Sequence, residues 1–147
     1  MSIKTMPARK EHPHPLNPEL QKAVERALRQ MRQVPDFKNV RFVLLYGSAA
    51  EGRMTAGSDI DLCVYYDGNR EDAALFRHVV LSQLPGLRYD IQVFQFLPLY
   101  VRVETLRGIP VFVRQERFLY ETATRTLREF EDFKHRLHDY TGQAPIV

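Results

Sequence analysis

The chain has 147 residues, enough for one domain with a substantial core, and 44% of them are hydrophobic. No apolar stretch is long enough to span a membrane, and the first residues lack the apolar segment of a secretory signal, so we expect a cytoplasmic protein without a membrane anchor. The net charge of +3 is compatible with RNA or an acidic partner and specifies neither. We expect residues 1–16 to be a flexible N-terminal tail, residues 17–141 a single domain, and residues 142–147 a loose C-terminus.

The first predicted element is a helix from Asn17 or Pro18 to about Val34, which Pro35 ends. Its apolar residues recur at three- and four-residue steps and predict one buried face, formed by Leu20, Val24, Ala27, Leu28 and Met31.

A hydrophobic run, VRFVLLY, then predicts a strand from Val40 to Tyr46 that ends at a Gly-Ser turn beginning with Gly47. A polar loop follows, and the segment DIDLCVYY predicts a second strand. Alternate side chains of a strand point to the same face, so Asp59 and Asp61 are expected to project together. The single cysteine of the chain, Cys63, excludes an internal disulfide, and we interpret it as a small packing residue of this strand.

Two carboxylates on one face repel each other unless a shared proton, a basic partner or a hard cation holds them. Mg²⁺ is the natural candidate, because it prefers oxygen ligands and binds through one or two carboxylates together with substrate phosphates. A lone pair of aspartates one residue apart is more often a turn residue and a solvated strand residue. The strand and the Gly47-Ser48 turn in front of the pair favour the metal site, since a glycine lets backbone amides approach a phosphate.

After the second strand, a turn at Asp67-Gly68-Asn69 precedes a predicted helix that packs on the sheet and closes at Pro85-Gly86. The next segment, YDIQVFQF, alternates as a strand, with Asp90, Gln92 and Phe94 on one face. If this strand pairs beside the second strand, Asp90 joins Asp59 and Asp61, and three carboxylates suffice to hold two metal ions.

The last third of the chain predicts a short helix over Pro98–Leu106, a short edge strand PVFVR that tolerates its proline, and a long amphipathic helix from about Glu116 to Tyr140. The apolar residues of the long helix are Leu119, Ala123, Leu127, Phe130 and Leu137. We interpret this stripe as packing on its own domain. Docking of another chain by the same stripe, in a homodimer or a tight hetero-complex, stays open.

The pattern of Gly47-Ser48, ten residues, Asp59-x-Asp61 and a later strand with Asp90 resembles the minimal nucleotidyltransferases (MNT) of the DNA polymerase β superfamily. These are small proteins that are often paired with a HEPN partner in prokaryotes. The likeness covers roughly Phe42 to Phe130, and its most specific part is the combination of the Gly-Ser pair, the spacer and the two aspartates. The resemblance implies an α/β (α+β) fold: a small mixed sheet flanked by helices, with a long C-terminal helix.

The resemblance also implies a Mg²⁺-dependent nucleotidyltransferase that uses ATP or another NTP and has two Mg²⁺ ions at the site. It implies Asp59, Asp61 and Asp90 as both the catalytic residues and the metal ligands. The residues that it implies for nucleotide binding are Gly47, Ser48, Gly52, Arg53 and Ser58. The implied reaction moves AMP onto a tyrosine of a HEPN toxin, whose antitoxin this chain would be.

One departure from the family pattern keeps alternatives open: Ala49, Ala50 and Glu51 stand where many relatives carry arginines, and Arg53 is the nearest substitute. A catalytically weak antitoxin that neutralises its partner by binding fits this departure. A nucleotidyltransferase that acts on RNA or on a small molecule is another alternative. A basic RNA-binding module without chemistry is a further class, but the chain lacks interleaved basic and aromatic motifs.

Overall fold

The computed structural model describes residues 16–52, 59–84, 86 and 88–141, so the expectations for the tail before Leu16 and for residues 142–147 lie outside the described part. The elements in chain order are α1 (Pro18–Gln33), the 3-10 helix η3 (Pro35–Asn39), β1 (Val40–Tyr46), α2 (Gly47–Ala50), β2 (Ile60–Tyr66), α3 (Arg70–Ser82), β3 (Tyr89–Val93), the 3-10 helix η4 (Phe94–Phe96), α4 (Leu99–Leu106), β4 (Ile109–Val113) and α5 (Glu116–Thr141).

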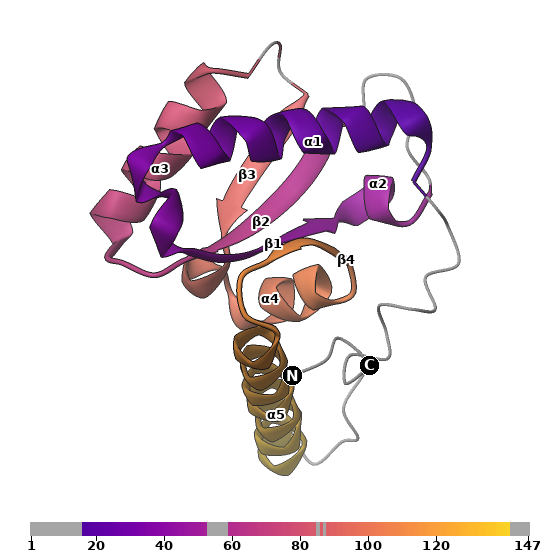
Figure 1. Ribbon diagram of the computed structural model, residues 1–147. Coiled ribbons are helices and arrows are strands. Elements are labelled where there is room, and N and C mark those ends of the chain that lie inside the picture. Colours follow the sequence, from indigo (N-terminus) through magenta and orange to yellow (C-terminus); the bar gives the residue numbers. More distant parts are fainter. Residues whose placement is uncertain (1–15, 53–58, 85, 87, 142–147) are drawn as a thin grey trace.

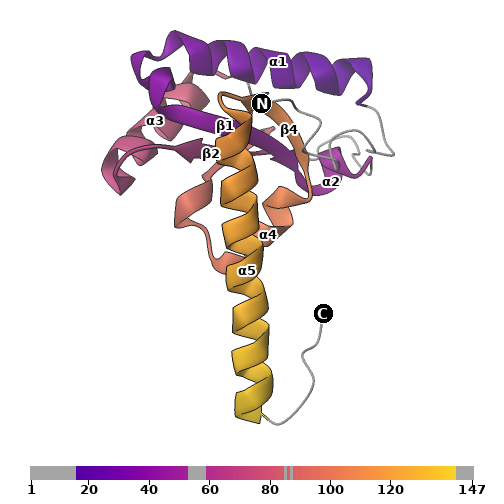
Figure 2. The same ribbon diagram turned by 60° about the horizontal axis from the view of Figure 1, so that its bottom comes forward.

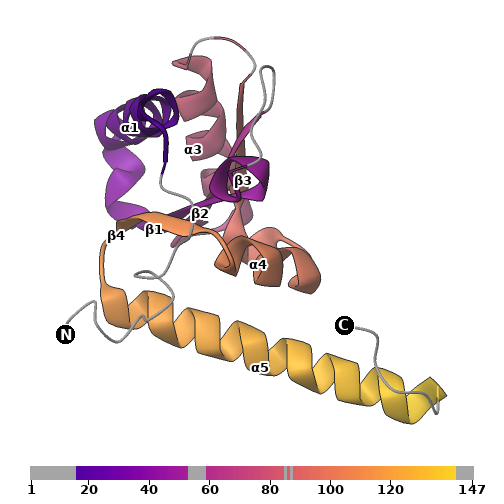
Figure 3. The same cartoon turned by 90° about the vertical axis from the view of Figure 1, so that its right-hand side faces the viewer.

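The four strands form one mixed sheet in the order β3-β2-β1-β4. β1 pairs antiparallel with both β2 and β4, whereas β2 pairs parallel with β3. Helices α1 and α3 cover one face of this sheet, and α4 and α5 lie on the other (Figures 1 and 3). The expected fold class, a small mixed sheet flanked by helices with a long C-terminal helix, is therefore confirmed.

The larger core lies between the sheet and helices α1 and α3. The predicted apolar face of α1 is buried at all five of its positions, Leu20, Val24, Ala27, Leu28 and Met31. The side chain of Asn17 caps this helix by accepting from the amide of Leu20 at 2.7 Å, and Asn69 caps α3 in the same way. These caps satisfy an amide of the first turn and fix where each helix begins.

The second core lies on the opposite face and holds α5. It consists of Phe42, Leu44, Cys63, Phe94 and Leu119. The first turns of α5 pack there, and the helix then extends beyond the sheet (Figures 2 and 3). The expectation that the stripe packs on its own domain is confirmed at Leu119 and wrong at Leu127 and Leu137, which are 47% and 43% exposed. Thr122 and Thr126 are buried instead, because they follow Leu119 at three- and four-residue steps and so share its face of the helix.

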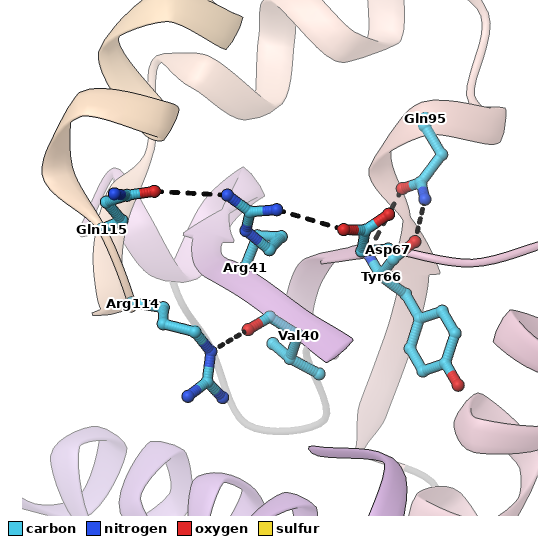
Figure 4. Close-up of polar contacts among 7 residues, drawn as sticks. All are labelled: Val40, Arg41, Tyr66, Asp67, Gln95, Arg114 and Gln115. Carbon is cyan, nitrogen blue, oxygen red and sulfur yellow. Dashed lines mark hydrogen bonds and ion pairs between the residues drawn. The ribbon is translucent and has the colours of Figure 1, made fainter. Parts of the chain in front are cut away.

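The predicted strand YDIQVFQF is shorter than expected, since β3 ends at Val93 and the 3-10 helix η4 follows. The side-chain amide of Gln95 then takes over the pairing by accepting from the backbone N–H of Tyr66 and donating to its carbonyl oxygen (Figure 4). β3 is an edge strand, so a side chain can reach the neighbouring backbone without displacing another strand. The proline of β4, Pro110, lies on the other edge strand, as predicted.

Two arginines tie the start of β1 to the segment that follows β4. Arg41 bonds Asp67 at 3.1 Å and Gln115 at 3.3 Å, and Arg114 donates to the carbonyl oxygen of Val40 at 2.7 Å (Figure 4). These contacts lie at the opposite end of β1 from Tyr46 and connect the strand to its neighbours there. None of the described helices is both long and apolar enough to cross a membrane.

Candidate active site

The two carboxylates that the sequence separates by 29 positions meet across the β2–β3 pair. In the parallel register of these strands, Asp61 lies directly opposite Asp90. Side chains at directly paired positions project to the same face as close neighbours. The strand with Asp90 therefore pairs beside the second strand in the way the alternation pattern anticipates.

Asp59 lies immediately before β2, where it is exposed. The backbone N–H of Ile60 donates to the carbonyl oxygen of Arg88, so the strand pairing already begins at this point. Ile60 and Leu62 are buried on the α1 and α3 side of the sheet, whereas Asp61 is half-buried and faces the other way. The predicted alternation is thus confirmed from Ile60 to Leu62, whereas Asp59 precedes the strand.

The electrostatics of Asp61 reflect this arrangement. Partial burial, and after it the charges of Asp90 and Asp59, raises the pKa of the Asp61 carboxyl to about 6. The described residues contain no group of three or more His, Cys, Asp and Glu side chains arranged to hold a metal ion. The donor set nevertheless fits a hard cation. Such an ion prefers oxygen ligands, and its charge would offset the repulsion between Asp61 and the neighbouring carboxylates.

Gly47 lies against the Asp61 carboxylate. Its φ of +75° is a left-handed conformation that favours glycine, and a Cβ at this position would meet Oδ2 of Asp61. The residues that follow are one turn of helix, α2, instead of the predicted turn and loop, because Ala49 and Ala50 are buried in the α1-side core and hold the backbone there. Ser48 is half-buried at the start of this turn.

The predicted nucleotide-binding residues are only partly described. Gly52 follows Glu51, both are exposed, and Gly52 has a φ of +74°. Arg53 and Ser58 lie outside the described residues. The alanines that depart from the family pattern are core residues, 3% and 2% exposed at positions 49 and 50. A charged side chain at either position would have to be buried or would displace the turn.

Two further polar residues border the carboxylates, and the sequence patterns gave neither a role. Tyr46, the residue before Gly47, pairs with Asp61 across the β1–β2 ladder, and burial followed by the charges of Cys63, Asp61 and Asp90 raises its pKa. Gln92 donates from Nε2 to Oδ1 of Asp90 at 2.9 Å. The available signals were the position of Tyr46 next to the Gly-Ser pair and the alternation that puts Gln92 on the face of Asp90.

Cys63 continues the face of the aspartates but is fully buried. Burial raises the pKa of its thiol to about 12, and a hydrogen bond with Thr105 only partly offsets this rise. A thiol with such a pKa is protonated at neutral pH and is not a nucleophile. The interpretation of Cys63 as a packing residue is confirmed.

Sequence comparison gives the family. The model of the polymerase beta nucleotidyltransferase family matches residues 32–117. The protein described as "Putative protein adenylyltransferase MJ1547" from Methanocaldococcus jannaschii is 33% identical over 97 residues, which cover 66% of this chain and 75% of the relative.

Solved structures share the fold at low sequence identity. A crystal structure of a toxin-antitoxin with AMP-PNP contains a chain with a TM-score of 0.64 and 15% identity, covering 80% of this chain and 94% of that one. A structure of the tri-AMPylated Shewanella oneidensis HEPN toxin in complex with MNT antitoxin gives 0.62 and 13%, covering 84% and 96%. The matching family model and the relative from Methanocaldococcus jannaschii show that this chain, with its paired carboxylates, belongs to the polymerase β nucleotidyltransferase family.

Proposed function

We propose that this nucleotidyltransferase moves AMP from ATP onto a tyrosine hydroxyl of a HEPN toxin and acts as its antitoxin. The observation that carries the proposal is the register that sets Asp61, two residues beyond Asp59, opposite Asp90 and beside the turn at Gly47. The relative described as a protein adenylyltransferase and the fold neighbours from toxin–antitoxin complexes support the choice of a protein acceptor.

Each site residue has a proposed role. Asp59, Asp61 and Asp90 would hold Mg²⁺, two ions in the full site, and bound Mg²⁺ would supply charge neutralisation for the triphosphate. The amide of Gly47 and the hydroxyl of Ser48 are donors for the phosphates that leave. Nucleotide binding by Gly52, Arg53 and Ser58 belongs to the same proposal.

The reaction forms one bond and breaks one. The acceptor oxygen bonds to the α-phosphorus of ATP, the bond from that phosphorus to the bridging oxygen of the β-phosphate breaks, and pyrophosphate leaves. The proton of the acceptor hydroxyl goes to Asp90, which can accept it because an ionised carboxylate is a base. Asp59 and Asp61 would remain negatively charged and would hold the cation that accompanies the triphosphate.

The test is transfer of label. Purified chain is incubated with Mg²⁺, the product of the neighbouring gene, and ATP, GTP, CTP or UTP labelled at the α-phosphate. Label on a tyrosine of the partner protein is expected, strongest with ATP, and the double variant Asp59→Asn, Asp61→Asn should lose it. Persistent labelling by the double variant would contradict the metal and catalytic assignment.

A second candidate, neutralisation by binding alone, is favoured by the buried alanines at positions 49 and 50 and by the exposed carboxylate of Glu51. In this case neither the wild type nor the double variant labels the partner, yet both silence it in a growth assay. Recovery of the label in RNA added to the reaction, with none on protein, would instead identify RNA as the acceptor.

A further inference from the structure

Gln92 lies two residues beyond Asp90 on the same face of the edge strand β3. Its Nε2 donates to Oδ1 of Asp90 at 2.9 Å, and both side chains are half-buried. A carboxylate has two acceptor oxygens, so this bond engages one of them and leaves Oδ2 available. The bond also restricts the rotation of the Asp90 side chain, whose partner in the strand register is Asp61.

The chemistry of the donor matters as much as its position. A neutral amide orients a carboxylate without neutralising it, whereas a lysine or arginine at this position would compete with a cation for the same charge. Residues that hold a metal-ligating group from behind set its orientation, and their loss typically lowers metal affinity or activity by about 10- to 100-fold. Glutamine therefore has the properties that a support of a cation-binding carboxylate requires.

We propose that Gln92 is a positioning residue, which fixes Asp90 with one oxygen bound and the other free for the site shared with Asp61. The inference rests on the proposed function, in which Asp90 binds the cation and accepts the proton. It adds that the working geometry of Asp90 depends on the side-chain amide at position 92.

The same segment contains a matched control. Gln95, three residues further on, also uses its side-chain amide, but its partner is the backbone of Tyr66 and no carboxylate. Gln95→Leu therefore removes a hydrogen-bonded glutamine from the same segment without changing a contact of the carboxylates. It should lower the thermal midpoint and leave kcat unchanged at temperatures where the protein is folded.

The experiment compares wild type with Gln92→Leu, Gln92→Glu, Gln95→Leu and Asp90→Asn. Mn²⁺ affinity is measured by electron paramagnetic resonance with α,β-methylene-ATP, which cannot release pyrophosphate, so this readout needs no turnover. For Gln92→Leu we expect Mn²⁺ affinity and kcat each to fall by about 10- to 100-fold, with the KM for ATP little changed. Gln92→Glu keeps the shape, loses the donor and places a second carboxylate against Asp90, so its kcat should fall at least as far.

The possible results separate the two levels of the proposal. Wild-type Mn²⁺ affinity and kcat in both Gln92 variants, with an inactive Asp90→Asn, would overturn the role of Gln92 and leave the proposed function standing. A fall in the kcat of Gln92→Leu without weaker Mn²⁺ binding would overturn it too, since a displaced Asp90 must affect both. An Asp90→Asn protein with normal kcat and Mn²⁺ affinity would overturn the proposed site and this inference together.

Discussion

Gly47 joins a backbone requirement to the chemistry of the site. Its left-handed φ permits the chain to turn from β1 into α2, and the missing side chain leaves room for the Asp61 carboxylate. Gly86 has nearly the same φ, +71°, but a Cβ built there meets no atom within 4 Å. The two glycines therefore separate the cost of the backbone conformation from the cost of crowding Asp61.

Substitution by alanine should show this difference. Gly86→Ala is expected to lose about 1–2 kcal/mol of stability, the usual cost of a left-handed conformation for a residue with a Cβ, and Gly47→Ala at least as much, because its Cβ must also displace the Asp61 carboxylate. Only Gly47→Ala should also lose nucleotidyl transfer. Urea unfolding gives the stabilities and the labelling assay gives the activity; equal activity of the two variants would show that Asp61 tolerates the added methyl group.

The raised pKa of Asp61 predicts how the stability of the fold depends on pH. Its pKa is about 6 in the folded chain and 3.8 in an unperturbed carboxyl, so between these pH values the folded state binds more protons than the unfolded state. The free energy of unfolding contributed by this group is therefore highest below about pH 4 and is lost as pH rises through about 6.

Asp61→Asn removes this titration. In the presence of EDTA, the thermal midpoint of the variant minus that of the wild type should increase as the pH is raised from 4 to 7. Solvent screening keeps the gain small, because Asp61 is only partly buried. A flat difference for Asp61→Asn would contradict the raised pKa.

At the scale of elements, the β2–β3 pair positions the carboxylates, whereas α5 packs against the second core through its first turns. The parallel pair needs α3 as its crossover connection, and its register alone brings Asp61 and Asp90 together. Helix α5 contacts the sheet through its first turns, where Leu119 is 1% exposed among Phe42, Leu44, Cys63 and Phe94.

Leu119 and Leu127 are eight residues apart on α5 and differ in burial, which gives a test of how α5 is held. Leu119→Ala should cost about 2–5 kcal/mol, because it empties a packed position between helix and sheet. Leu127→Ala, at a position that is 47% exposed, should stay within about 0.5 kcal/mol of wild type. Chemical denaturation measures both. Similar losses in the two variants would mean that α5 packs through a different face.

At the scale of the whole molecule, Arg114 connects distant segments at the end of β1 that lies away from the carboxylates. Arg114 donates to the carbonyl oxygens of Val40 and Phe37 at 2.7 and 2.8 Å, and its guanidinium lies over the rings of Phe37 and Phe112. These bonds connect segments that are more than 70 positions apart in the chain. They hold η3 and β4 together, and with them the strand that carries Tyr46 and Gly47 at its other end.

Removal of this connection should lower global stability without removing chemistry. Arg114→Ala is expected to cost about 1.5 kcal/mol, the lower range for hydrogen bonds from a charged donor. The control is Arg117→Ala, whose exposed ion pair with Glu121 is 4.0 Å long and is worth about 0.5 kcal/mol or less. Transfer activity at low temperature should be retained in both. A selective loss in Arg114→Ala would mean that the contacts of Arg114 also control the geometry of the site.

Local patterns predicted most elements because they depend on neighbours in the sequence. The face of α1, the strand Val40–Tyr46 and the alternation from Asp59 to Leu62 follow from spacing and from side-chain polarity. The end of β3 was not predictable in this way. Gln95 replaces strand pairing only because Tyr66 lies beside it, 29 positions away in the chain.

The sequence by itself determined the chemistry that is available: two aspartates on one strand face, a third on a later strand, and a glycine before them. The tertiary structure decided which of these groups meet. The register of a parallel pair is set by packing on both faces of the sheet, so the opposition of Asp61 and Asp90 and the contact of Gly47 with Asp61 arise only when the strands assemble. The bond from Gln92 to Asp90 is local in sequence, but only the register places the bonded carboxylate opposite Asp61.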